Sequence, residues 1–120
     1  MIQGTFGERG QLFFEIDLIT TDRLYLPVDA MLDTGFTEFM AINKQDLNGL
    51  AWSYLGKEPL QTAQGESVFE RYYGKVLIDG QEYVIPVFTG EEITEILLGS
   101  QWLKILPLVV NYQTGLLTLG

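Results

Sequence analysis

Hydrophobic and polar residues alternate along much of this chain with the two-residue period of β-strands. Residues 12–19 place an apolar side chain at every second position, with Glu15 among the polar positions between them, which predicts a strand with one buried face. The turn-forming residues 20–23 follow, and the apolar stretch 24–32 is typical of the partner strand. Pro27 lacks a backbone N–H, so we expect its part of that strand to lie at a sheet edge or bulge.

Strand patterns also fill the second half of the chain, separated by turn residues. Residues 61–78 are apolar at both ends and carry small polar residues at 63–67, which predicts a hairpin with an exposed tip. Asp79-Gly80 is a strong signal for a two-residue type I′ turn, because both residue types tolerate a positive φ. The strands expected around this turn and near the C-terminal end span residues 75–78, 83–88, 108–112 and 116–119.

Two short helical segments interrupt these patterns. Asn43 fits the N-cap of a helix over residues 44–55, and Ser100 fits the cap of a helical turn over residues 101–105. Together the patterns predict an all-β fold, namely a closed antiparallel β-barrel with one or two short helices. A length of 120 residues fits a single domain that covers residues 1–120.

The sequence contains no His and no Cys, which limits its chemistry. Their absence excludes catalysis of the Ser-His-Asp and Cys-His types, disulfides, and zinc sites with imidazole or thiolate ligands. Carboxylates are then the main candidates for acid–base catalysis, and Lys or Tyr is a weaker one, because no basic residue stands beside a Ser in a recognisable motif.

The net charge of −9 is the opposite of a phosphate-binding surface, so neither nucleic acid nor an anionic membrane is an expected partner. No apolar run approaches the length that spans a bilayer, and the N-terminal residues lack the pattern of a signal peptide. We therefore expect a soluble cytoplasmic protein.

The strongest candidate for chemistry is the triplet Asp33-Thr34-Gly35. It follows the apolar run 28–32, so a buried strand would deliver the Asp33 carboxylate to a sharp turn. One interpretation is a structural Asx-turn that joins two strands. The other is a catalytic carboxylate, and the triplet alone does not decide between them.

Two further motifs accompany the triplet, the predicted hairpin tip at residues 63–65 and Leu97-Leu98-Gly99. Together with Asp33-Thr34-Gly35-Phe36, their order resembles that of the retroviral-type (retropepsin-like) aspartic proteases, and most closely the small prokaryotic members with an Asp-Thr-Gly-Phe motif. The resemblance covers nearly the whole chain. It implies a single-lobed acid-protease barrel with endopeptidase activity that requires no metal and no cofactor.

The resemblance implies a role for each residue of the triplet. Asp33 is similar to the catalytic Asp, which meets the same residue of a second copy in a homodimer. Thr34 resembles the residue that contacts the partner's backbone, and Gly35 resembles the one that lets backbone and substrate approach closely. The implied reaction is hydrolysis of a peptide or protein substrate by a water molecule that the paired Asp33 carboxylates activate.

Residues on either side of this turn are expected to complete the site. Phe36 and Thr37 lie at positions that the resemblance places in a substrate subsite, and Leu97-Leu98-Gly99 is expected to support the turn from beneath. Phe36 stands where retroviral enzymes usually have Ala, so its ring either narrows that subsite or packs into the core.

The predicted hairpin tip is similar to the flap of these enzymes, which closes over a bound peptide. Ala63, Gln64 and Gly65 would form the flap tip, with Gly65 permitting the turn. Gln64 stands where related sequences often have Asp.

Two other functions remain open. A catalytically inactive retropepsin-like dimer would keep the barrel and would bind peptides or regulate a partner. A glycoside hydrolase would need Glu15 or Asp17 beside Asp33 in one cleft, but the strand alternation turns both side chains toward solvent. The loop at residues 91–95 carries three Glu residues without the spacing of a calcium site, so we expect it to be solvated.

Overall fold

β-Strands dominate the secondary structure, as the sequence pattern predicts. The computed structural model describes residues 1–120 apart from the side chain of Thr62. The strands are β1 (Ile2–Gln3), β2 (Thr5–Phe6), β3 (Leu12–Ile19), β4 (Tyr25–Leu32), β5 (Met40–Ala41), β6 (Ser53–Thr62), β7 (Gly65–Ile78), β8 (Gln81–Thr89), β9 (Leu97–Leu98), β10 (Leu108–Asn111) and β11 (Leu116–Leu119). The helices are α1 (Lys44–Leu47) and the 3₁₀ helix η1 (Ser100–Lys104).

The N-terminal alternation forms the predicted hairpin. β3 and β4 pair antiparallel along their whole length, and Phe14, Ile16 and Leu18 are buried while Glu15 is exposed. Pro27 lies in the half of β4 that has no second partner strand among the described pairings. The prediction that Pro27 lies at a sheet edge is therefore confirmed.

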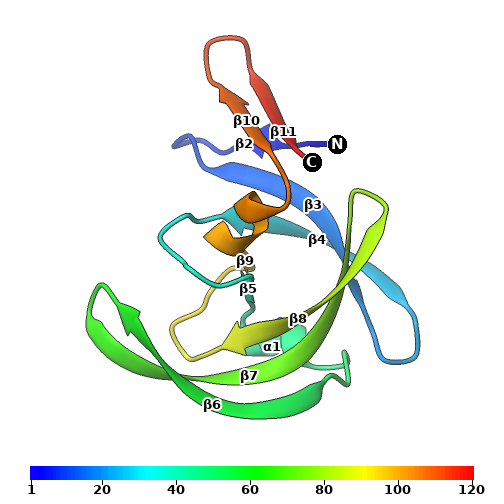
Figure 1. Cartoon of the computed structure of the whole chain (residues 1–120), viewed down its shortest axis with the longest axis vertical. Coiled ribbons are helices and arrows are strands. Elements are labelled where there is room, and N and C mark those ends of the chain that lie inside the picture. Colours follow the sequence, from blue (N-terminus) through cyan, green and yellow to red (C-terminus); the bar gives the residue numbers. More distant parts are fainter.

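The longest strands follow in the second half of the chain, where β6, β7 and β8 form consecutive antiparallel pairs. Asp79 and Gly80 join β7 to β8 with φ values of 54° and 75°, as a type I′ turn requires. Figure 1 shows β6 and β7 curving together around one side of the molecule.

Pairing between distant segments closes the barrel. Its six strands follow the order β3-β4-β9-β5-β8-β7, and β7 returns to β3 through the pairs Asp17↔Leu77 and Leu18↔Val76. The predicted closed barrel is confirmed. Most pairs are antiparallel, but β4 with β9 and β5 with β8 are parallel.

A small sheet of three strands, in the order β1-β11-β10, brings the two ends of the chain together. The N-terminal ammonium group of Met1 forms an ion pair with Asp79 of the β7–β8 turn. In Figure 1 the β10–β11 hairpin projects from one end of the barrel, and both termini lie beside it.

Trp102 of η1 is the largest fully buried side chain and fills the interior of the barrel. Its ring makes edge contacts with Phe39 and Tyr83, at centroid distances of 4.9 and 5.0 Å. Aromatic rings favour this edge-to-face arrangement. The 3₁₀ helix is thereby anchored to β8 and to the segment before β5.

The helix predicted over residues 44–55 is wrong beyond its first turn. The Asn43 side chain caps α1 by accepting a hydrogen bond from the Asp46 N–H (2.8 Å), as expected, but the helix ends at Leu47. Gly49 and Ala51 then adopt left-handed φ values of 85° and 57°, which no α-helix accommodates. The chain turns there so that it can enter β6.

The predicted cap at Ser100 is also wrong. Gly99 takes the N-cap position without a side-chain hydrogen bond, and Ser100 is the first residue of η1. The Ser100 N–H donates instead to the carbonyl oxygen of Phe36 (2.8 Å). In the part of the chain that the structure describes, neither helix has the length or apolar character to cross a membrane.

Candidate active site

Asp33 leaves the end of β4 at the start of a tight turn, the Asp33 turn (residues 33–36). Its backbone N–H donates to the Leu98 carbonyl oxygen (2.9 Å), and its own carbonyl oxygen accepts from the Phe36 N–H (3.1 Å). The Asp33 Oδ1 atom accepts a hydrogen bond from the Gly35 N–H (2.9 Å). These contacts fix both the backbone and the direction of a partly buried carboxylate.

The predicted Asx-turn is thus present. Its hydrogen bond also fixes the direction of the Asp33 carboxylate, so a structural turn and a chemical role for Asp33 are compatible. Thr34 and Gly35 are exposed on the turn. A Cβ atom at Gly35 would lie 3.2 Å from the Asp33 Oδ1 atom, so a larger residue would crowd the carboxylate.

Residues 33–39, the Asp33 loop, pass around the end of β9 to reach β5, because β9 lies between β4 and β5 in the sheet. Hydrogen bonds join this loop to the segment after β9. They run from the Gly99 N–H to the Phe39 carbonyl (2.9 Å), from the Ser100 N–H to the Phe36 carbonyl (2.8 Å), and from the Gln101 Nε2 to the Thr37 carbonyl (3.0 Å). The Gln101 N–H also donates to the Glu38 carbonyl (3.4 Å), so the loop is braced at four points.

Gly99 lies directly beneath the Asp33 loop. A Cβ atom there would overlap the backbone carbonyl of Glu38 and approach the Phe36 ring to 2.8 Å. Only glycine fits this crossing. Leu98 is fully buried in the main core, and Leu97 packs beside the loop. The support that we expected from Leu97-Leu98-Gly99 consists of these contacts.

Phe36 packs into a small apolar cluster. The cluster consists of the buried residues Ala41, Phe69 and Phe88, with Phe36, Leu60, Ile93 and Leu97 against them. The Phe36 and Phe88 rings meet edge to face at a centroid distance of 6.1 Å. The sequence leaves open whether the Phe36 ring narrows a subsite or packs into the core. In the structure the ring packs against this cluster. Thr37 is exposed.

Glu38, on the same loop, is partly buried. Burial, together with repulsion from the Glu58 carboxylate, raises the pKa of Glu38, and the Arg71 guanidinium partly opposes this change. Arg71 is itself paired with Glu58 at 3.2 Å between β7 and β6. An electrostatic network thus links the Asp33 loop to the β6–β7 hairpin.

A cleft of about 440 Å³, the Asp33 cleft, opens beside the carboxylate. It is lined by Gln11, Met31, Asp33, Glu92, Ile93, Thr94, Glu95 and Leu97. Of these lining residues, the sequence predicts only Asp33 and Leu97 as part of the site. Met31 could have been found, because it lies two residues before Asp33 on one strand and so shares its face.

The acidic loop (residues 91–95) could also have been placed here, since it leads directly into β9 beside β4. Its three Glu side chains are exposed, as expected. Gln11 carried no signal in the sequence, because it approaches the cleft from the connection before β3.

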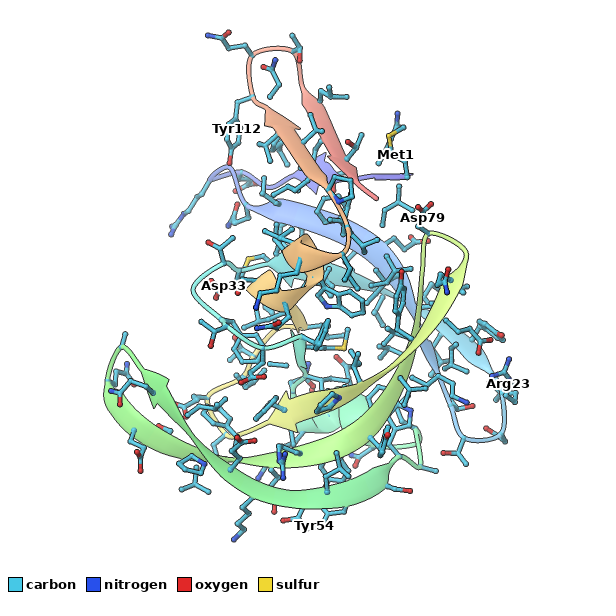
Figure 2. The ribbon with its side chains drawn as sticks, in the orientation of Figure 1. Met1, Arg23, Asp33, Tyr54, Asp79 and Tyr112 are labelled. Carbon is cyan, nitrogen blue, oxygen red and sulfur yellow. The ribbon has the colours of Figure 1, made fainter. Side chains whose placement is uncertain are left out.

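Ala63 and Gln64 form the exposed two-residue tip between β6 and β7, and Gly65 begins β7 with a φ of 108°. The exposed hairpin tip is confirmed. These residues do not line the Asp33 cleft. In the view of Figures 1 and 2, the tip and Asp33 lie toward the same side of the molecule, opposite Arg23 and Asp79.

Glu15 and Asp17 line a different cleft, together with Leu77 and Asp79. They do not meet Asp33, so the structure does not assemble the carboxylate pair that a glycoside hydrolase would need.

Comparison with protein-family models gives no match, and no curated protein matches the sequence. Solved structures do match. A retropepsin-like aspartic protease from Rickettsia conorii aligns with a TM-score of 0.63 and 19% identity, over 99% of this chain and 88% of that one. The fold is retropepsin-like. The EIAV protease complexed with the inhibitor HBY-793 aligns with a TM-score of 0.64 and 15% identity, over 83% of this chain and 91% of that one.

The retropepsin-like fold explains why two distant motifs meet. Asp33-Thr34-Gly35 follows β4 and Leu97-Leu98 forms β9, and these parallel neighbours end at the same edge of the barrel. Two motifs that are far apart in the sequence, Asp33-Thr34-Gly35 and Leu97-Leu98-Gly99, are therefore in contact in the structure.

Proposed function

We propose that this chain is an aspartic endopeptidase that acts as a homodimer. The observation that carries the proposal is the Asp33 carboxylate, which a braced turn holds at the edge of an open cleft within a retropepsin-like fold. Carboxylates are also the main candidates for acid–base catalysis in a sequence without His and Cys.

The dimer follows from the chemistry. An aspartic protease needs two carboxylates about 3 Å apart, which share one proton because both cannot ionise at that separation. The printed sequence offers one Asp-Thr-Gly triplet, and the side-chain contact described for Asp33 is to the Gly35 backbone. A second copy would supply the other Asp33, and the exposed Thr34 is suited to contact that copy.

In the proposed reaction the ionised Asp33 takes a proton from water, and the water oxygen attacks the scissile carbonyl carbon. The protonated Asp33 of the other copy donates its proton to the carbonyl oxygen, giving a gem-diol. Collapse of the gem-diol breaks the C–N bond, while one carboxyl donates its proton to the leaving amine and the other carboxylate takes a proton from a gem-diol hydroxyl, which becomes the new carbonyl. No acyl-enzyme forms, and the site returns to one shared proton.

The β6–β7 hairpin would serve as the flap. Its tip residues Ala63 and Gln64 are exposed, and the half of the hairpin nearer the tip contacts the Asp33 loop through the apolar cluster that contains Phe36 and Phe69. An exposed hairpin tip beside the Asp33 loop is suited to opening and closing over an extended peptide.

The test is peptide cleavage by the Asp33→Asn variant. Asn retains an Oδ1 acceptor for the Gly35 N–H, so the turn and the dimer should persist while cleavage falls at least about a thousandfold. Cleavage would be followed on unstructured peptides, with dimer content measured by analytical ultracentrifugation and with a statine inhibitor as a second control. A variant that still cleaves would refute the proposal, and a dimer that binds peptides but never cleaves them would support the inactive alternative.

A further inference from the structure

The walls of the Asp33 cleft differ in character. Met31 of β4 and Leu97 of β9 are paired neighbours in the parallel register and give it an apolar side. The acidic loop gives the other wall, with Glu92 and Glu95. A ligand in this cleft would therefore meet hydrocarbon and carboxylates together.

The carboxylates of the acidic loop are not equivalent. Glu91 does not line the cleft, and its carboxylate is neutralised by the Lys44 ammonium group at 2.8 Å. Glu92 and Glu95 take part in none of the ion pairs formed by the described residues. Beside Asp33, the acidic loop thus gives the cleft two carboxylates with no ion-pair partner among the described residues.

The spacing of these carboxylates disfavours a metal ion as their partner. Among the described residues, no three acidic side chains lie close enough together to hold one. A long organic cation fits better, because the aliphatic stem of Lys or Arg covers apolar surface while its charged head reaches polar groups. The chain itself is poor in such cations, with 7 basic against 16 acidic residues.

We propose that the Asp33 cleft selects peptides with a Lys or Arg side chain close to the scissile bond. The stem would lie along Met31 and Leu97, and the cationic head would pair with Glu92 and Glu95. This inference rests on the proposed protease function and names the substrate class of the same site.

The test compares cleavage of a pool of unstructured peptides before and after acetylation of their lysines, with cut sites mapped by mass spectrometry. Acetylation keeps the stem and removes the charge. We expect cuts to cluster near Lys and Arg, and cleavage near acetylated Lys to fall about tenfold in kcat/KM, a difference of 1.4 kcal/mol. Because wild-type protein is used, the result does not depend on how a variant folds.

The double variant Glu92→Gln/Glu95→Gln should lose this preference while still cleaving acetylated peptides, and it should lose the salt sensitivity of cleavage. Glu91→Gln is the control, since it removes one negative charge from the same loop but outside the cleft. Equal cleavage of native and acetylated peptides by the wild type would overturn this inference and leave the protease function standing. Absence of all cleavage would overturn both.

Discussion

The charge of Glu38, on the Asp33 loop, affects the stability of the protein. Its carboxyl group is partly buried and lies near Glu58, and both features oppose ionisation. The raised pKa means that the Glu38 carboxyl holds its proton more tightly in the folded protein than in the unfolded chain. The contribution of Glu38 to the free energy of unfolding therefore falls as pH rises above the ordinary carboxyl value of 4.5.

We predict that Glu38→Gln stabilises the protein near neutral pH, because the amide carries no charge to desolvate. The gain should be about 0.5 kcal/mol or less, since solvent screens a partly exposed group. It should shrink as pH falls below 4.5, where the wild-type carboxyl is protonated in both states. Urea denaturation of both proteins across this pH range measures the difference.

Glu8→Gln controls for the loss of one negative charge, because Glu8 is exposed in the turn before β3. If Glu38→Gln gave no more stability than Glu8→Gln near neutral pH, or if its effect did not change with pH, the electrostatic account of this loop would be wrong.

The positions of some single residues can be predicted from the sequence, and those of others cannot. Asp33 could be predicted, because its apolar strand and its turn are local features. The position of the Phe36 ring could not, since it depends on Phe88 and Phe69, which reach it only after the barrel closes. The charge network of Glu38, Glu58 and Arg71 is non-local for the same reason.

At the scale of elements, the crossing between β9 and the Asp33 loop is the tightest feature of the site. We predict that Gly99→Ala destabilises the protein by about 1–3 kcal/mol, because its Cβ would displace the Glu38 carbonyl and no flexible side chain can absorb the overlap. The displaced loop carries Asp33, so cleavage should fall more than stability alone explains. Chemical denaturation and a cleavage assay well below the unfolding transition separate the two effects.

Thr37→Ala is the matched control, because it changes an exposed side chain on the same loop. Its effect on the free energy of unfolding should stay within about 0.5 kcal/mol. A Gly99→Ala protein as stable as Thr37→Ala would show that the crossing has more room than its contacts indicate.

Elements with local signals were predictable, and those made by distant pairing were not. The β3–β4 hairpin and the Asp79-Gly80 turn follow from alternation and turn chemistry. β5 and β9 contain only two residues each, too few for a period, and they exist because β4 and β8 pair with them. β6 contains Gly56 and Pro59, which disfavour strands, and its pairing with β7 overrides this preference.

At the scale of the molecule, the proposed dimer makes each chain half of a site. The barrel and the bracing of the Asp33 turn are complete within one chain. The carboxylate pair is not, because the Asp33 side chain has no second carboxylate among its described contacts. Activity should therefore depend on association, and dilution below the dimer dissociation constant should abolish it.

The most direct test mixes wild-type chains with Asp33→Asn chains at a constant total concentration and allows the subunits to exchange. If both Asp33 residues of a dimer are required, activity follows the square of the wild-type fraction, and an equal mixture retains about one quarter of it. Our account predicts this quadratic fall. An equal mixture that retained about one half, in a linear series, would show that each chain works alone and would contradict the shared site.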